Sequence, residues 1–266
     1  MAGTIERPRA PRAPAARPPA SRKRRAPKRR RSWLRRTMVR LIVLLLLAAL
    51  ACAGALTALV VVTPDVADAP ERVASQAAEH GTRVETSVPS RVAAALIATE
   101  DSRFFTDPGL DPLGVLRWVG GTVAGSPDAG GATLEQQLAK LLYTGGRQDP
   151  VSEAEQVGLA LKLAHTYSKQ RILELYLSTA YFGHGYYGVS AAAEGYFHRS
   201  PDRLAWPQAA LLAGLVQAPS AYDPVTHPAL ALSRRGHVLE RLVATGRLSQ
   251  EQAATFGRAG LQLAGR

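Results

Sequence analysis

Apolar residues along most of this chain recur at the spacing of amphipathic helices, and strictly alternating, strand-like segments are few. One predicted helix carries Val92, Ala95 and Leu96 and leads towards Glu100. The remaining apolar faces are Leu134, Leu138 and Leu141; Ile172, Leu173, Tyr176 and Leu177; and a nearly continuous run from 204 to 216. Glycines and prolines punctuate the segments between them. We therefore predict a mainly α-helical domain without internal repeats.

A different apolar pattern fills residues 41–62, which contain no charged side chain. At about 1.5 Å rise per residue this run spans roughly 33 Å, enough to cross the hydrocarbon core of a bilayer. It is longer than the apolar core of a signal peptide, which is about 7–15 residues. We predict an uncleaved transmembrane helix. The single cysteine, Cys52, lies within it and is interpreted as a membrane-helix residue, with lipid attachment as the alternative.

The net charge of +12 is concentrated before this helix. Fifteen of the 33 Lys and Arg residues fall in the first 40 positions against one acid, Glu6, and the remaining 226 residues carry a small net negative charge. Residues 1–31 are rich in Pro, Ala and Arg and are predicted to be disordered. The basic cluster at 22–31 suits either nucleic acid or anionic lipid headgroups, and its nearness to the membrane helix favours the lipid. We expect no nucleic-acid partner.

These patterns predict four parts. Residues 1–40 form a basic cytoplasmic tail, 41–62 the transmembrane helix, 63–89 a linker with a short helix, and 90–266 an extracytoplasmic domain. The orientation follows from the rule that basic flanks stay in the cytoplasm. The chain is thus predicted to be a single-pass protein of the cell membrane.

Glu100 is the first candidate for chemistry. It follows an apolar helical stretch and precedes Asp101 and the pair Phe104 and Phe105. Apolar surroundings raise the pKa of a carboxyl because desolvation disfavours its charge, which suits a general base near neutral pH. Taken alone, an acid at a helix end is more often simply solvated.

A second candidate segment follows Gly130-Gly131. Thr133, Gln136, Gln137 and Lys140 have the spacing i, i+3, i+4, i+7, so they form one polar stripe on a helix. A helix start with a hydroxyl, two amides and an ammonium suits an anionic, sugar-bearing substrate. The alternative is an ordinary amphipathic helix.

These two segments and four later ones together resemble the signature of glycosyltransferase family 51, the polymerising domain of class A penicillin-binding proteins and monofunctional transglycosylases. The resemblance covers about residues 90–240. Its motifs are similar to Glu100-Asp101-x-x-Phe104, Gly130-Gly131-x-Thr133-x-x-Gln136-Gln137-Leu138-x-Lys140, the stretch from Tyr167 to Leu177, Tyr181-Phe182-Gly183, Gln217-Ala218-Pro219-Ser220 and Arg234-Arg235.

The resemblance implies a lysozyme-like helical fold and a glycosyl transfer. In the family, the Glu matching Glu100 deprotonates the 4-hydroxyl of the acceptor lipid II, which attacks a donor glycan on polyprenyl diphosphate. A second Glu, with basic residues and a divalent cation (Mg or Mn), assists departure of the diphosphate. The implied partners are lipid II, the polyprenyl-diphosphate-linked glycan, the membrane and other cell-wall synthesis proteins. The implied substrate-binding residues are Asp101, Phe104, Thr133, Gln136, Gln137, Lys140 and Arg199; no metal ligands are assigned.

The chain departs from the family where the diphosphate leaves. The family pattern Arg-Lys-x-x-Glu falls on Ser152, Glu153 and Gln156, so two cations and the second acid are lost. Three further departures are Asp107 for His, Ala132 for Ser and Glu135 for Thr, and Arg199 for Lys is a milder one.

Three acids near these departures are candidates to compensate for Gln156. Glu155 is adjacent in sequence, but Ser152-x-x-Glu155 also fits a capping box, which we take as its role. Glu153 lies one turn before Gln156, and Glu135 is a new acid in the second motif. Acids in a first helical turn ordinarily stabilise the helix through its dipole, which is the alternative role for Glu153 and Glu135.

Three functions remain in contention. The first is an active monofunctional peptidoglycan glycosyltransferase, and the second is a catalytically impaired homologue that binds lipid II or glycan, or scaffolds wall synthesis. The third is a lysozyme-like hydrolase with Glu100 as general acid. No Ser-x-x-Lys or Lys-Thr-Gly motif occurs, so we expect no transpeptidase activity from this chain.

Overall fold

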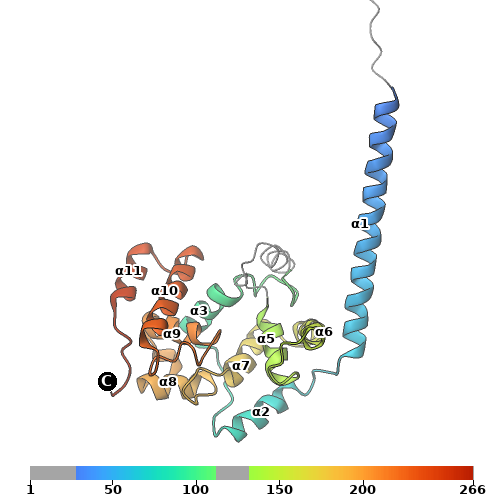
Figure 1. Ribbon diagram of the computed structural model, residues 1–266. Coiled ribbons are helices and arrows are strands. Elements are labelled where there is room, and N and C mark those ends of the chain that lie inside the picture. Colours follow the sequence, from blue (N-terminus) through green and yellow to red (C-terminus); the bar gives the residue numbers. More distant parts are fainter. Residues whose placement is uncertain (1–27, 112–131, 266) are drawn as a thin grey trace, which may run out of the picture. The chain divides into compact units, whose positions relative to one another are not determined.

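The structure is a computed structural model that describes residues 28–111 and 132–265, with side chains from residue 35 onward (Figure 1). The disorder predicted for residues 1–31 is wrong for residues 28–31, which belong to a helix, and otherwise lies outside this range. The predicted turn at Gly130-Gly131 also lies outside it. The chain forms two compact units, Met1–Ala51 and Cys52–Arg266.

The first long helix, α1, runs from Lys28 to Val62. Its part Arg35–Val62 is long and apolar enough to cross a membrane, by length and composition. The predicted span 41–62 falls inside this helix, and Cys52 lies on it as an exposed free thiol. The protein thus has one candidate membrane helix near its N-terminus among the residues described.

The second unit is built from short helices. They are α2 (Ala69–Glu79), α3 (Ser90–Glu100), α5 (Leu134–Leu142), α6 (Pro150–Thr166), α7 (Lys169–Thr179), α8 (Val189–Phe197), the 3₁₀ turn η1 (Pro201–Arg203), α9 (Trp206–Leu215), α10 (Pro228–Ala244) and α11 (Gln250–Arg258). Extended pairing within the described range is limited to an isolated bridge between Tyr181 and Tyr187. The predicted mainly helical architecture is confirmed.

These helices pack in two groups that share one core. The helices α3, α9, α10 and α11 contact one another, and α5, α6 and α7 form the neighbouring group with α2 (Figure 1). The predicted apolar stripe on α7 is buried throughout, and α9 is buried along nearly its whole length because every side of it meets another helix. The two groups bring the end of α3 close to α5 and α10, where the site lies.

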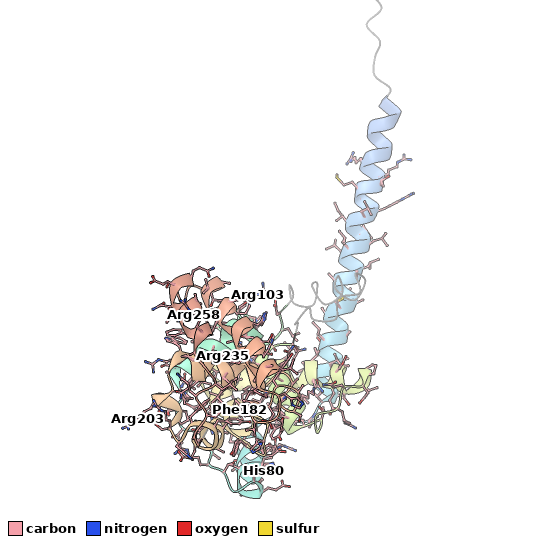
Figure 2. All side chains as sticks on the ribbon, turned by 60° about the vertical axis from the view of Figure 1, so that its left-hand side comes forward. His80, Arg103, Phe182, Arg203, Arg235 and Arg258 are labelled. Atoms are coloured by element: carbon pink, nitrogen blue, oxygen red, sulfur yellow. The ribbon has the colours of Figure 1, made fainter. Side chains whose placement is uncertain are left out.

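Two buried side chains show how the loops are held to this core. Phe182 is fully buried in the loop between α7 and α8, and Figure 2 shows it within the helical domain, whereas Arg203 projects from the edge. Arg235 of α10 is also buried, and its guanidinium donates to the backbone carbonyls of Gly257 and Gly260. This arginine therefore secures the C-terminal helix α11 to α10.

The last turn of α1 packs closely against α6. A Cβ at Gly158 would lie 2.7 Å from the carbonyl oxygen of Leu59, so only glycine permits this approach. Lys162, one turn further along α6, donates to the carbonyls of Thr63 and Pro64 at 2.7 and 3.0 Å. An ammonium at these carbonyls satisfies groups that the helix end leaves without partners.

The predicted boundaries of tail, membrane helix, linker and domain stay a prediction. Within the predicted linker, α2 buries Val73 and Ala77, and Val73 belongs to the core of the helical unit. The linker segment thus contributes to the packing around the site.

Candidate active site

Glu100 is the last residue of α3, and its carboxylate is largely buried, with a side chain 13% exposed. Its two oxygens face different donors. Arg234 of α10 donates to Oε1 at 3.0 Å, and Gln137 of α5 donates to Oε2 at 3.4 Å. The structure therefore joins residues from three helices that are far apart in the sequence.

The surroundings of Glu100 act on its pKa in opposite directions. Burial is the largest cause and raises the pKa, while the charge of Arg234 and the hydrogen bonds from Gln137 and Arg234 lower it. The net effect is a raised pKa, in the direction that the apolar approach along α3 predicts. A carboxylate of this kind is suited to accept a proton near neutral pH.

The side chain of Gln137 accepts a hydrogen bond from a buried tyrosine. The hydroxyl of Tyr176 on α7 donates to Gln137 Oε1 at 2.8 Å. Tyr176 is buried, and desolvation keeps its pKa well above the usual range, so its hydroxyl stays protonated. Tyr176 and Arg234 were not among the predicted site residues, although both lie in segments that resemble family motifs.

The start of α5 is fixed by hydrogen bonds between predicted site residues. Thr133 is the N-cap and accepts from the backbone amide of Gln136, whose side chain accepts in return from the Thr133 amide. Asp101 accepts from the amide of Leu134, the first residue of the helix. Three of the predicted substrate-binding residues thus hold the helix start in this structure. The spacing Thr-x-x-Gln is a capping-box pattern that was readable in the sequence.

Two of the departures from the family pattern, Asp107 and Glu135, meet at one lysine. Lys169 at the start of α7 lies 3.2 Å from Asp107 Oδ1 and 2.8 Å from Glu135 Oε1, and both carboxylates are almost fully buried. Its ammonium also lies 4.6 Å from the ring centroid of Phe104, a cation–π contact. Glu135 is thus engaged with Lys169 in the core.

Asp107 and Glu135 share the single cation Lys169, and the charges of both acids act on Asp101. Desolvation, together with the charges of Asp107 and Glu135, raises the pKa of Asp101 to about 7. Burial also raises the pKa of Glu135, with the hydrogen bond from Lys169 acting against it. Asp101, which follows Glu100 directly, therefore keeps its proton to a higher pH than an ordinary surface acid does.

Gln156, the residue in place of the second family acid, is buried on α6 and binds the loop between α5 and α6. Its amide nitrogen donates to Thr144 Oγ1 at 2.8 Å and to the carbonyl oxygen of Arg147 at 3.0 Å. A carbonyl only accepts, so the amide nitrogen has to face it. Gln156 therefore acts as a two-donor clamp on residues 144–147.

The predicted capping box at Ser152 and Glu155 is wrong. Helix α6 begins at Pro150, and Asp149 is its N-cap, because its carboxylate accepts from both the amide and the hydroxyl of Ser152. Proline favours the first helical position, where no amide donor is needed. Ser152 lies inside the first turn and is buried, and Glu155 instead lies 3.9 Å from Arg147.

The remaining predicted residues are more open. Glu153 is exposed, and its charge opposes the burial that lowers the pKa of Lys140. Arg199 is exposed in the turn after α8, and none of its described hydrogen bonds joins it to Glu100 or α5. Two cations are connected to the loop that Gln156 holds: Arg147, whose carbonyl accepts from Gln156, and Lys140, whose carbonyl accepts from Thr144. Arg147 was not among the predicted site residues.

Residues 70–243 match the protein-family model described as Transglycosylase. The chain belongs to the transglycosylase family. The predicted membership of glycosyltransferase family 51 and the predicted lysozyme-like helical fold are thereby confirmed.

Among the relatives of this transglycosylase, penicillin-binding protein 1A of Aquifex aeolicus (strain VF5) is 40% identical over 166 residues, which is 62% of this chain and 23% of the relative. Penicillin-binding protein 1A of Escherichia coli (strain K12) is 37% identical over 166 residues, 62% and 20% of the respective chains. Penicillin-binding protein 1F of Bacillus subtilis (strain 168) is 37% identical over 169 residues, 63% and 24%.

The chain thus spans about a quarter or less of the length of these relatives. A crystal structure of penicillin-binding protein 1A from Haemophilus influenzae also matches, with 35% identity, a TM-score of 0.35, and coverage of 36% of this chain and 14% of that one.

The position of the second family acid offers no carboxylate to the divalent cation that the family resemblance implies. The Gln156 amide nitrogen donates to Thr144 and Arg147, so only the neutral amide oxygen of this side chain has lone pairs for a metal. Within the described residues there is no group of three or more His, Cys, Asp or Glu side chains arranged to hold a metal. The divalent cation stays a prediction.

Proposed function

We propose that this transglycosylase polymerises lipid II into glycan strands with Glu100 as the general base. The observation that carries the proposal is the buried Glu100 carboxylate with a raised pKa, held by Gln137 and Arg234. Membership of the family supports peptidoglycan glycosyl transfer as the class of reaction.

In the proposed step, Glu100 removes the proton of the acceptor 4-hydroxyl. The oxygen then forms a bond to the anomeric carbon of the donor, and the bond from that carbon to the diphosphate oxygen breaks. The diphosphate leaves with the electron pair, and the proton remains on Glu100. Arg234 favours the ionised carboxylate before this step, which is the form that a general base needs.

The leaving-group side of the site is the weaker half. Ser152 is buried under Asp149, Glu153 adds negative charge, and Gln156 clamps a loop. The cations with a described interaction in this segment are Arg147, which lies 3.9 Å from Glu155, and Lys140, on which the charge of Glu153 acts. A departing diphosphate needs positive groups aimed at it, so we expect slow turnover.

The test is polymerisation of labelled lipid II by the full chain in detergent, with Mg²⁺, with Mn²⁺ and with a chelator, followed on a gel. We expect polymer from the wild-type chain and none from Glu100→Gln. Absence of polymer from the wild-type chain under every metal condition would overturn the proposal.

A second candidate function is an impaired homologue that binds lipid II or glycan, or that scaffolds other cell-wall synthesis proteins. The observation that favours it is the clamp at Gln156, which gives the position of the second family acid a structural role. Saturable lipid II binding without any polymer would support this function over the first.

The cellular setting follows from the candidate membrane helix Arg35–Val62. We propose that it anchors the chain in the cell membrane as a single pass, with the basic tail cytoplasmic and the catalytic domain outside. Protease protection of the tail in sealed membrane vesicles checks this orientation.

A further inference from the structure

The Gln137 amide beside Glu100 needs a partner to keep it turned the right way. A side-chain amide has a donor end and an acceptor end of nearly the same size. If the amide turned over, its oxygen would face Glu100 Oε2, and two acceptors would meet at a distance of 3.4 Å. The bond to Glu100 is long, so it holds the orientation only weakly by itself.

Tyr176 supplies the stronger hold. Its hydroxyl lies 2.8 Å from Gln137 Oε1, and the side chain is only 2% exposed, packed among the buried residues of α7. A buried tyrosine hydroxyl rarely lacks a partner, and this one meets the acceptor end of the amide. Hydroxyl, amide and carboxylate thus form a chain from the core of α7 through α5 to the end of α3.

On this geometry we propose that Tyr176 is a positioning residue for Glu100, acting through Gln137. The proposal rests on the proposed function of Glu100 as general base. Tyr176 does not touch substrate in this scheme. It fixes the amide so that the nitrogen donates to the carboxylate, which holds Glu100 in place and favours its ionised form.

Arg234 is the charged group that faces Glu100 from the other side. It approaches Oε1 from α10, whereas the amide approaches Oε2 from α5. Arg234 also donates to the carbonyl of Gly214, so its position does not depend on Tyr176. Loss of the Tyr176 hydroxyl therefore removes support from one oxygen of Glu100 and leaves the other unchanged.

The decisive variant is Tyr176→Phe, with Tyr196→Phe as the matched control. Tyr196 is equally buried and donates one hydrogen bond, to the carbonyl of Phe182 at 3.0 Å, away from Glu100. Both substitutions remove one buried hydroxyl, so their general effects on folding are comparable. Only Tyr176→Phe is expected to change the behaviour of Glu100.

In the lipid II assay, we expect Tyr176→Phe to lower kcat about fivefold at pH 7, the equivalent of one hydrogen bond, with little change in KM. The acidic limb of its pH–rate profile moves to higher pH, because a lost donor raises the pKa of the base. A rise in KM at constant kcat would overturn the proposal, since it would assign Gln137 and Tyr176 to substrate binding.

The second measurement is independent of activity. Carbon-13 NMR of glutamate carboxyls in the full chain in detergent, with the Glu100 signal assigned by Glu100→Gln, follows the titration directly. We expect the midpoint to move to higher pH in Tyr176→Phe and to stay in Tyr196→Phe. If Tyr176→Phe does not fold, Gln137→Met tests the link that the proposal requires, because it removes the amide through which Tyr176 acts; the midpoint is expected to move in the same direction, and an unchanged midpoint would overturn the proposal.

The two proposals fail in different ways. A wild-type chain that makes no polymer overturns the proposed function, and the titration still decides whether Tyr176 acts on Glu100. A Glu100 titration that is unchanged in Tyr176→Phe, or shifted equally in Tyr196→Phe, overturns the positioning role even if the chain polymerises lipid II.

Discussion

Replacing Gln156 by glutamate restores the acid of the family pattern and removes the clamp on the α5–α6 loop. The amide nitrogen of Gln156 makes two hydrogen bonds, at 2.8 Å to Thr144 Oγ1 and at 3.0 Å to the Arg147 carbonyl. The Thr144 hydroxyl donates to the Lys140 carbonyl at 3.3 Å and can turn to donate to a carboxylate instead, so one hydrogen bond replaces another there. The Arg147 carbonyl cannot, and it would face a second acceptor.

The expected loss of stability follows from these two contacts. A buried acceptor left without a donor costs about 1–3 kcal/mol, and burial of the new charge adds to this. We expect Gln156→Glu to lower the free energy of unfolding by about 2–4 kcal/mol, or the Tm by about 5–15 °C in a domain of this size. The loss should be smaller at pH 5 than at pH 8, because burial raises the folded-state pKa of the new carboxyl and its protonated form can donate to Arg147.

The measurement is thermal unfolding of the full chain in detergent at both pH values, with Gln148→Glu as the control. Gln148 is exposed in the same loop, so the same exchange there is expected to change Tm little. Equal stability of Gln156→Glu and wild type at pH 8 would refute the clamp. In the lipid II assay we expect Gln156→Glu not to exceed the wild-type rate, because Ser152 and Glu153 still differ from the family pattern.

Three further predictions concern other contacts. The folded-state pKa of Asp101, about 7, lies above its ordinary value, so the native state binds a proton that the unfolded state releases. The stabilisation from this proton is present below about pH 4 and is lost as the pH rises to about 7. Asp101→Asn should therefore reduce the fall in Tm between these pH values. Gly158→Ala should lower Tm by several degrees, because its Cβ meets the Leu59 carbonyl, whereas alanine at the open position Gly236 of α10 should not. Lys169→Met leaves two buried carboxylates without their cation, and a loss of about 3–5 kcal/mol in chemical denaturation is expected at pH 8; a loss below 1 kcal/mol would contradict the pairing.

Local patterns were enough to predict most of the helices. The stripe from Ile172 to Leu177 is buried as predicted, because its spacing alone determines which face meets the core. The sequence also contains the true start of α6, because Asp149-Pro150 is an N-cap residue followed by proline. The capping-box pattern at Ser152 predicts a different start, which is wrong. When two capping patterns lie three residues apart, the sequence alone does not rank them.

Contacts between distant segments could not be derived from spacing. Arg234 lies 134 positions after Glu100, and their ion pair depends on how α3 and α10 pack. The link from Tyr176 through Gln137 similarly joins two helices whose relative rotation no local pattern specifies. The family resemblance places Glu100, Gln137, Tyr176 and Arg234 in motifs, and the structure shows which of these side chains form hydrogen bonds with one another.

The buried group of Asp107, Glu135 and Lys169 also constrains how this sequence can change. With either acid replaced by the neutral side chain of the family pattern, the lysine keeps one counter-ion and the core stays balanced. With both replaced, Lys169 loses both of its ion pairs, and its ammonium is left against the Phe104 ring with the charge of Asp101 still acting on it. We therefore expect the two positions to be epistatic. Either acid can be replaced while the other remains, in either order, but replacing both removes both ion pairs of Lys169.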